Sequence, residues 1–390
     1  MLKYISQRIA FAFLTLFVII VIVFLMVAQF SDNPFARKAL DLAGAAGADK
    51  ATDNTAQIKI YFDESVRHHL TPAGLNFEEV KNTWTTLKVN PIIRLGYWFQ
   101  NLFTNHANPF GEPYDPEILK NTGTSTIPQF FFSYLRFSAI ITVPAFIISV
   151  IAGITLGIVA GYKRGTMFDA AINLFALFFV ALPSFVIAPI LISILLSANV
   201  PPVFLNPVDP NVLQTSGWGQ IITSWLAPIF IIALGSLSGY ITYTRNQVIT
   251  VLTSNYVLIA KSKGLSTKEI FFKYVLRNIS IPLAAVLIPS YIGLLTGGIV
   301  IETYWRVPGT SYVISQAFPN GEINIIMFNL VFFTSLSVFT TILVDVSFTF
   351  LDPRIKYGSK NPYSYLQFYK AHRSREKEFK EYIIGGGNEF

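Results

Sequence analysis

Residues 9–30 read IAFAFLTLFVIIVIVFLMVAQF, a run of 22 residues without a charged side chain. A helix needs about 20 mostly apolar residues to cross the hydrocarbon core of a bilayer. The run is too long for the apolar core of a secretory signal peptide, and no small-residue cleavage site follows it. The sequence therefore predicts a retained transmembrane helix over Ile9–Phe30.

Five more apolar runs of spanning length follow along the chain. They are Phe137–Tyr162, Ala170–Ala198, Ile221–Thr244, Leu283–Ile301 and Ile325–Phe350. Only the last of them contains a charged residue, Asp345. The six runs together predict an all-α integral membrane protein with six transmembrane helices.

The composition excludes most other classes of protein. Hydrophobic residues make up 52% of the chain and charged residues 13%, whereas soluble domains carry about 25% charge. The chain has no cysteine, which excludes disulfide frameworks and thiolate metal sites. Its four histidines lack the spacing of a metal-binding motif. We therefore expect no bound metal and no directly bound cofactor.

The distribution of charge predicts which ends of the helices face the cytoplasm. Six spans place both termini on one side, together with residues 163–169 and the loop 245–282. Counting Asp345, this side carries 18 basic and 8 acidic residues, whereas the opposite side carries 11 and 14. Because cytoplasmic loops are enriched in Lys and Arg, both termini are predicted to be cytoplasmic. The positive charge then faces the lipid bilayer, and no nucleic-acid partner is needed to explain it.

The chain divides into four predicted parts. Residues 1–30 hold the N-terminal tail and the first span, and residues 31–136 form an extracytoplasmic insertion. Residues 137–350 form a transmembrane core of five helices, and residues 351–390 form a cytoplasmic tail.

Three polar stretches outside the spans are predicted to be helical. They are Phe77–Lys88, Pro91–Thr104 and, in the tail, Tyr365–Ile384. The second carries a stripe of aromatic and aliphatic residues that suits the membrane interface. The insertion is interpreted as a helical cap packed on the membrane core, with docking of a substrate or partner as the alternative.

Small residues recur at every fourth position in three of the predicted spans. They are Gly153, Gly157 and Gly161, then Gly235 and Gly239, then Gly293 and Gly297. This spacing places glycines on one face of a helix, where two backbones can approach closely. The stripes predict helix packing within the chain or at an interface between subunits.

The chain lacks the residues that would power transport or catalysis by itself. Asp345 is the only charged residue in a predicted span, and it is interpreted as a structural partner of a nearby donor. No GxxxxGK[ST] phosphate-binding loop is present. The stretch Gly235–Gly239 is not a nucleophile elbow, because its middle residue is Leu237. We therefore predict a non-enzymatic subunit whose energy comes from another protein.

The most informative loop runs from Arg245 to Pro282. It is long and basic, and it is predicted to form two helices separated at Gly264. Glycine there suits a left-handed residue that ends a helix, and Ser266 with Glu269 fits a capping box that starts the next one. The loop is interpreted either as an amphipathic element on the inner leaflet or as a docking element for a cytoplasmic partner.

The stretch Tyr256–Leu265, followed by Leu276–Asn278 and Pro282, closely resembles the "EAA" loop of ABC-importer membrane subunits, in the oligopeptide and dipeptide permease branch. The generic pattern is EAA, three further residues and then Gly. Ala260 and Gly264 match the last Ala and the Gly of that pattern.

Four other segments are similar to the same branch. They are Tyr162–Gly165, Leu182–Phe185, Glu302–Gly309 and Leu351–Ile355. The resemblance covers residues 1–30 and 92–356. The chain departs from the family in the longer segment 31–90, in the tail beyond residue 356, and in Leu258 and Ile259, which replace the Glu and the first Ala.

The resemblance implies the architecture of a type I ABC-importer permease and a division of labour among subunits. A second homologous permease subunit would complete the translocation path. Two cytoplasmic ATP-binding subunits would hydrolyse ATP, and an extracytoplasmic peptide-binding protein would deliver peptide. The residues implied to couple this chain to an ATPase are Tyr256, Ala260, Lys261, Lys263, Gly264 and Leu265.

We therefore predict the permease subunit of an ATP-driven importer of oligopeptides or dipeptides in a prokaryotic plasma membrane. An ion-coupled secondary transporter subunit is the first alternative, and the charge-poor spans argue against it. A structural or assembly protein is the second alternative. Metal chelates, sugars or other solutes remain open as cargo.

Overall fold

The computed structural model describes residues 2–45, 51–351 and 365–385. The long helices are α1 (Leu2–Phe30), α7 (Ile127–Tyr162), α10 (Pro210–Leu252), α13 (Leu276–Gly297) and α16 (Ile323–Leu351). The shorter helices are α2 (Pro34–Ala45), α3 (Ala51–Arg67), α4 (Phe77–Val80), α5 (Pro91–Thr104), α6 (Glu117–Lys120), α8 (Met167–Ala181), α9 (Ser184–Ser197), α11 (Asn255–Ser262), α12 (Thr267–Ile270), α14 (Ile299–Tyr304), α15 (Thr310–Ala317) and α17 (Tyr365–Gly385).

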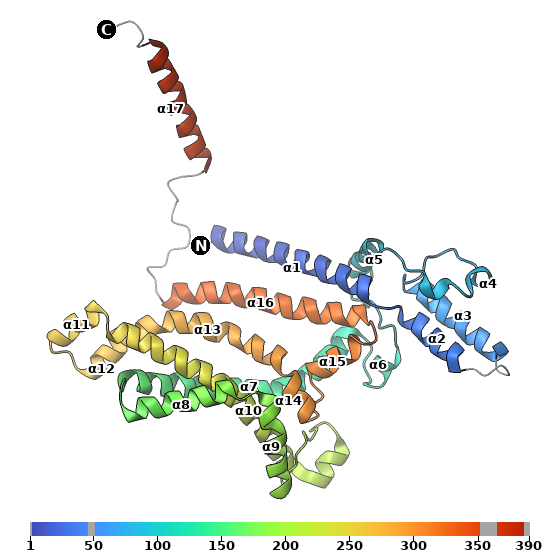
Figure 1. Ribbon diagram of the computed structural model, residues 1–390, viewed down its shortest axis with the longest axis horizontal. Coiled ribbons are helices and arrows are strands. Elements are labelled where there is room, and N and C mark those ends of the chain that lie inside the picture. The colour runs from blue at the N-terminus through green and yellow to red at the C-terminus, as the bar shows by residue number, and fades with distance from the viewer. Residues whose placement is uncertain (1, 46–50, 352–364, 386–390) are drawn as a thin grey trace.

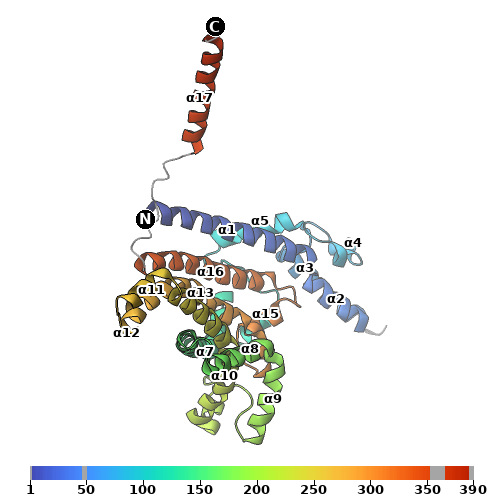
Figure 2. The same ribbon diagram turned by 60° about the vertical axis from the view of Figure 1, so that its left-hand side comes forward.

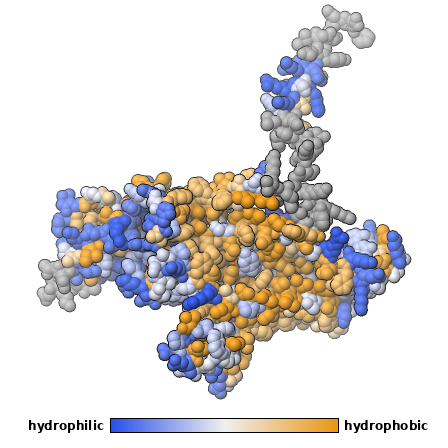
Figure 3. All heavy atoms as spheres, turned by 180° about the vertical axis from the view of Figure 1, so that it is seen from behind, coloured by the Kyte–Doolittle hydropathy of each residue, from blue (hydrophilic) through white to orange (hydrophobic). Residues whose placement is uncertain are grey.

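The long helices lie roughly alongside one another and give the molecule two distinct ends (Figure 1). Helices α2 to α6 gather at one end, here called the insertion end, and α11 with α12 lie at the opposite end, here called the loop end. On the face shown in Figure 3, apolar side chains cover the middle and hydrophilic ones gather at both ends. This is the distribution expected of a bundle whose middle lies in hydrocarbon. The prediction of an all-α membrane protein is confirmed.

The third predicted span, Ala170–Ala198, is not one continuous helix. It is divided into α8 and α9, which are bent by 97° relative to each other. Pro183 stands at the break, and Leu182 before it has extended backbone angles, φ −87° and ψ 112°. A proline disfavours helical geometry in the residue that precedes it. The described residues thus contain five helices long and apolar enough to cross a membrane, or six candidate spans if this bent pair counts as one.

Helices α7 and α10 form the closest helix pair of the core, and both views place them side by side (Figures 1 and 2). The three glycines of α7 face α10. A Cβ atom added to Gly153 would lie 2.5 Å from Tyr240 Cβ, and one added to Gly157 would lie 2.8 Å from the Ile241 carbonyl oxygen. At Gly161 the nearest atom, at 2.7 Å, belongs to Val248. This stripe therefore packs two helices of the same chain.

The other glycine stripes have no such partner among the described residues. Nothing lies within 4 Å of a Cβ atom placed on Gly235, Gly239 or Gly293. The surroundings of Gly297, the last residue of α13, lie outside what the structure describes. Packing within the chain thus explains the α7 stripe but not the stripe of α10 or Gly293.

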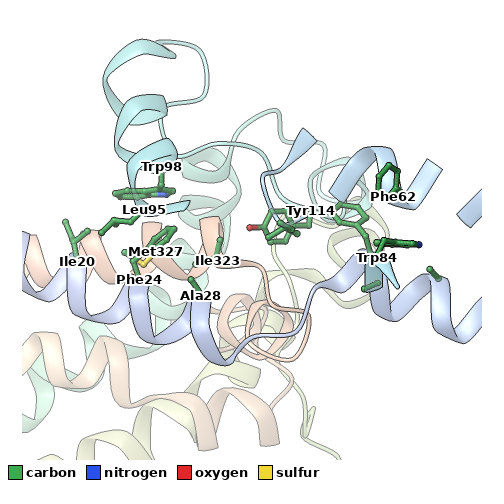
Figure 4. Packing of buried hydrophobic residues seen from close by; sticks show 14 of the residues in the cluster. Ile20, Phe24, Ala28, Phe62, Trp84, Leu95, Trp98, Tyr114, Ile323 and Met327 are labelled. Carbon is green, nitrogen blue, oxygen red and sulfur yellow. The ribbon is translucent and has the colours of Figure 1, made fainter. Parts of the chain in front are cut away.

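The insertion end has its own apolar core, which joins it to α1 and α16. Figure 4 shows Phe24 of α1, Trp98 of α5 and Met327 of α16 gathered on one side of this core. Phe62 and Trp84 lie on its other side. The interpretation of this segment as a helical cap packed on the bundle agrees with this arrangement.

Of the two helices predicted in this segment, one is present as predicted and the other is not. Helix α5 spans Pro91–Thr104 as expected, because Asn90 caps it and Pro91 occupies its first position. The stretch predicted as one helix over Phe77–Lys88 instead contains the single turn α4 and a 3₁₀ turn over Trp84–Thr86. Trp84 is fully buried, so tertiary packing determines the conformation there. In the tail, α17 agrees with the helix predicted over Tyr365–Ile384.

Glu322, at the start of α16, holds the insertion segment onto the bundle. The side chain is almost fully buried, and its carboxylate accepts hydrogen bonds from the backbone N–H groups of Tyr114 at 2.7 Å and Asp115 at 2.8 Å. Burial raises the pKa of this carboxyl to about 7, against a usual value of 4.5. The contact joins residues more than 200 positions apart in the sequence.

Asp345 near the other end of α16 is paired. Its carboxylate lies 3.2 Å from Nε of Arg8 on α1. The pair links two helices that run alongside each other (Figure 1). This geometry agrees with the structural role expected for the single charged residue of the predicted spans.

Replacing Gly157 by Val should loosen the contact between α7 and α10. The new side chain would meet backbone atoms of α10, which cannot rotate away. We expect a loss of about 3 kcal/mol of unfolding free energy, at the upper end for overpacked cores, measured on the isolated chain by equilibrium unfolding in mixed micelles. Gly235→Val is the matched control, because open space surrounds that position. Equal losses in both variants would contradict the packing assignment.

Glu322 should make stability depend on pH. Between pH 4.5 and about 7 the folded carboxyl retains a proton that the unfolded chain has released, so stability falls as the pH rises through this window. The total loss is about 3 kcal/mol, and Glu322→Gln should abolish it. Glu117→Gln, in the exposed helix α6, should keep the wild-type profile. A Glu322→Gln profile parallel to wild type would refute the effect.

Candidate functional site

Helix α11 ends in a hydrogen-bonded turn built around Gly264. The glycine has φ +78°, the left-handed conformation that favours glycine over residues with a side chain. Its N–H donates to the Lys261 carbonyl at 2.9 Å, and the Leu265 N–H donates to the Ala260 carbonyl at 3.2 Å. These two bonds are the pair that defines a Schellman motif. The left-handed cap predicted at Gly264 is confirmed.

The next helix starts with the capping box expected from the sequence. The Ser266 N–H donates to the Glu269 carboxylate at 3.0 Å, and the Glu269 N–H donates to the Ser266 hydroxyl at 3.3 Å. Helix α12 then continues through a π-type turn over Phe271–Val275 directly into α13. The loop is therefore continuous with α13 in one direction and separated from α10 by only two residues in the other.

One face of α11 is anchored in a small apolar core at the loop end. Val257 is fully buried and Ala260 is 2% exposed. They pack in a cluster whose other buried members are Val248, Val251, Ile270, Val275, Ile279 and Leu283, from α10, α12, the π-type turn and α13. A displacement of α11 would therefore act on α10 and α13 directly.

The opposite face of α11 is open. Tyr256, Leu258 and Ile259 are 42%, 52% and 55% exposed, and the two lysines Lys261 and Lys263 are exposed beside them. Large apolar side chains next to cations, outside the apolar core of their own chain, are typical of a docking surface. Among the described residues, Tyr274 stacks its ring on that of Tyr256, with centroids 6.3 Å apart, and the side chains of this face remain exposed.

The six residues expected to couple this chain to a partner differ in their exposure to solvent. Tyr256, Lys261, Lys263 and Gly264 are exposed, Leu265 is half-buried, and Ala260 is buried. Ala260 is therefore not accessible for direct contact, and its place in the apolar core accounts for a small residue there. Leu258 and Ile259, which replace Glu and Ala of the generic pattern, contribute most of the exposed apolar surface of α11.

An ion pair next to the loop end was not anticipated from the sequence. Asp169 of α8 receives two hydrogen bonds from Arg245 of α10, Nε to Oδ1 at 2.6 Å and Nη2 to Oδ2 at 2.8 Å. The Gly165 N–H and the Asn173 side chain also donate to this carboxylate. The only signal was that an acid at the start of one apolar run and a base at the end of the next lie on the same side of the membrane.

A buried carboxylate near the insertion end was also missed. Glu302 of α14 is 1% exposed. It accepts hydrogen bonds from the hydroxyl of Ser138 at 2.6 Å and from the backbone N–H of Ser311 at 3.0 Å, and the Ser311 hydroxyl also contacts it. A Cβ atom on Gly309 would collide with this carboxylate. The motif Glu302–Gly309, quoted above only for resemblance, thus joins α7 to α14 and α15.

The described residues offer no metal centre at the loop end. No group of three or more His, Cys, Asp or Glu side chains is placed to hold a metal ion in that part of the chain. The loop end instead presents the exposed helix α11, which is fixed to the long helices α10 and α13.

The comparisons with known proteins agree with the resemblance drawn from the motifs. The model of the family described as "Binding-protein-dependent transport system inner membrane component" matches residues 153–357, which include the whole loop end. The oligopeptide transport system permease protein OppB of Mycoplasma genitalium is 27% identical over 379 residues, covering 97% of this chain and 82% of the relative.

Two further relatives carry the same printed name. The protein of Salmonella typhimurium is 30% identical over 225 residues, covering 56% of this chain and 69% of the relative. The protein of Escherichia coli K12 is 29% identical over the same length, with the same coverage. The Mycoplasma protein is thus the one of these three whose match extends through nearly all of this chain.

Breaking the ion pair between Asp169 and Arg245 should destabilise the loop end strongly. The two side chains are 6% and 20% exposed, and removing one partner of a buried pair costs about 3–5 kcal/mol, so the partly exposed Arg245 left behind should bring the cost to about 3 kcal/mol, the lower end of this range. We expect Asp169→Asn to lower the unfolding free energy by this amount, and the further change Arg245→Gln to restore part of it. Glu117→Gln removes a pair whose side chains are 61% and 67% exposed and should cost less than about 1 kcal/mol. Strictly additive losses at Asp169 and Arg245 would show that the pair is not coupled.

Proposed function

This chain belongs to the family of binding-protein-dependent transport system inner membrane components, and we propose that it forms half of the translocation path of an ATP-driven oligopeptide importer. The cargo is taken from the names of the relatives, which are oligopeptide permeases. The chain itself is a non-catalytic subunit, and ATP acts through separate cytoplasmic subunits.

The observation that carries the proposal is the two-sided construction of α11. Its inner face is fixed to α10 and α13 by Val257 and Ala260, while its outer face exposes Tyr256, Leu258 and Ile259. We propose that a groove of an ATPase subunit receives this outer face. Closure of the ATPases would then displace α11, and its anchored face would carry the motion to the long helices, which is a two-state coupling between ATP and cargo.

Several features support the proposed assembly. The loop end is rich in lysine and faces the cytoplasm in our proposal, as do both termini, in a prokaryotic plasma membrane. The insertion formed by residues 31–136 then lies outside, where a peptide-binding protein would dock. Among the described residues nothing packs against Gly235, Gly239 or Gly293, and we propose that a second homologous permease packs near them.

In the proposed mechanism, the ion pair of Asp169 and Arg245 connects a further helix, α8, to α10. It fixes the start of α8 to Arg245 of α10, seven positions before α10 ends at Leu252. A movement of the cytoplasmic end of α10 would therefore take α8 with it. The bent pair of α8 and α9 is in this way part of the moving unit.

Replacing Gly264 by Val should uncouple transport from ATP. A β-branched residue strains the left-handed conformation at φ +78° and opens the Schellman motif that sets the direction of the chain between α11 and α12. In proteoliposomes that contain the complete complex, we expect peptide uptake per ATP hydrolysed to fall at least about tenfold. A tenfold fall corresponds to a loss of about 1.4 kcal/mol in the free energy that couples the ATPase to the transport path.

Gly74→Val is the matched control, because Gly74 also has a positive φ, +83°, and open space around it, but lies in the insertion. It should leave the uptake per ATP unchanged. Normal coupling in Gly264→Val would overturn the assignment of α11. Ionophore-sensitive uptake by the chain without ATPase subunits would overturn the importer as a whole in favour of a secondary carrier.

A further inference from the structure

Helix α10 is the most enclosed of the candidate membrane helices. In its most apolar stretch of 18 residues, 61% of the residues are buried, against 28% or less in the other four continuous spans. Helix α7 covers one side of it through the glycine contacts described above. Two hydrogen bonds join it to α13, from the Tyr240 hydroxyl to that of Ser290 at 2.7 Å and from the Tyr243 hydroxyl to the Pro282 carbonyl oxygen at 3.2 Å. The exposed residues of α10 lie on the side that neither helix covers.

This exposed side of α10 is polar. Between residues 231 and 246 the exposed positions are Gly235, Gly239, Thr242 and Asn246. Since they are three or four residues apart, they share one face of the helix. Nothing lies within 4 Å of a Cβ atom placed on either glycine, and no described residue forms a hydrogen bond with the Asn246 side chain. The face therefore presents uncovered peptide backbone, a hydroxyl and a free carboxamide, and no charge.

Helix α13 adds a second row of exposed residues beside the first. Between residues 283 and 296 the exposed positions are Val286, Pro289, Gly293 and Thr296. Helix α7 packs on α13 as well as on α10, since the rings of Phe146 and Tyr291 have centroids 6.4 Å apart. Tyr291 also pairs with Thr340 of α16 through hydroxyls 2.8 Å apart. Because α7 lies behind both helices, the exposed rows of α10 and α13 open on the same side of the bundle.

Surface that suits lipid has a different composition in this chain. The exposed residues of α7 include Val143, Ile147, Ile148 and Ile151, and those of α8 include Leu174, Leu177, Phe178 and Val180. Large apolar side chains of this kind fit hydrocarbon, whereas polar residues inside a membrane usually face a bundle interior or a water-filled path. The exposed rows of α10 and α13, with their glycine, threonine and asparagine, therefore belong to the second kind of surface.

We propose that this surface lines the path along which peptide passes. It is here called the polar wall, and its residues are Gly235, Gly239, Thr242, Asn246, Gly293 and Thr296. The inference rests on the proposed function and adds to it the chemistry by which the path meets its cargo. From Gly235 to Asn246 the wall extends for about 16 Å along the helix axis. The second permease would enclose the path from the opposite side.

The polar wall suits the part of a peptide that is common to all sequences. Hydroxyl and carboxamide groups can both donate to peptide carbonyls and accept from peptide N–H groups. At a glycine, no side chain holds the peptide backbone away from that of the helix. The wall has no charged residue to attract or repel a charged side chain of the cargo. Peptides of different sequence and charge should therefore pass it at similar rates.

The sequence contains no cysteine, so an introduced cysteine is the only one in this chain. The test uses proteoliposomes with the complete complex, its peptide-binding protein and a negatively charged methanethiosulfonate reagent, added during ATP turnover. A cysteine reacts as its thiolate, which forms in contact with water, so Thr242→Cys and Thr296→Cys should be modified at least about tenfold faster than Ile148→Cys. The last variant is the matched control on the apolar surface of α7. Saturating peptide should slow modification of the two wall variants severalfold, as the intact mass of this chain reports.

A charge placed in the polar wall should make the path discriminate between peptides. We expect Thr242→Lys to lower the uptake of a lysine-rich peptide, relative to a glutamate-rich one, at least about tenfold, since like charges a few ångströms apart repel strongly at low dielectric. Thr242→Asp should shift the ratio in the opposite direction. Both uptakes are measured on the same variant, so a lower yield of folded protein leaves their ratio unchanged.

Several results would overturn the polar wall and leave the importer intact. One is modification of Thr242→Cys and Thr296→Cys no faster than that of Ile148→Cys, in a complex that still imports peptide with ATP. That result would identify a dry helix contact with another subunit. Others are rapid modification that peptide does not slow, and an unchanged uptake ratio in both charge variants. Failure of the unmodified complex to import peptide with ATP would instead overturn the proposed function.

Discussion

The backbones of α7 and α10 touch at three glycines of α7, and much of the bundle is attached to one or other of these two helices. Ser138 of α7 joins the buried carboxylate of Glu302 and so holds α14. Arg245 of α10 holds α8 through Asp169. The loop end packs on the last turns of α10. In a membrane, where lipid tails offer no hydrophobic drive between helices, such close van der Waals packing is a principal source of association.

The sequence predicted what depends on local rules. Long uncharged runs identified the membrane helices. Gly264 followed by Ser266 and Glu269 predicted a helix end and a helix start, because both are fixed by hydrogen bonds within a few residues. The glycine stripe of α7 predicted a close contact, although not that α10 would be the partner. The resemblance of residues 256–265 to a known loop then gave the functional interpretation.

The features that the sequence did not predict are pairings between distant residues. Asp169 meets Arg245 across 76 positions, Ser138 meets Glu302 across 164, and Tyr114 meets Glu322 across 208. No periodicity connects such residues, since their neighbourhood is created by the packing of whole helices. The bend at Pro183 was missed for a different reason. Prolines also occur within α7, α9, α10 and α13, so proline alone does not distinguish a break from a continuous helix.

The four-residue spacing of the α7 glycines has a consequence for movement. Their contacts on α10, Tyr240, Thr244 and Val248, are spaced by four residues as well. A small slide of one helix along the other would drive these side chains into backbone, and the next position that fits is a full step of four residues, or about 6 Å, away. The spacing of these contacts therefore opposes any smaller slide of α7 along α10. A rearrangement that opens a path by a smaller movement must leave the contact between α7 and α10 intact and occur at other helix contacts.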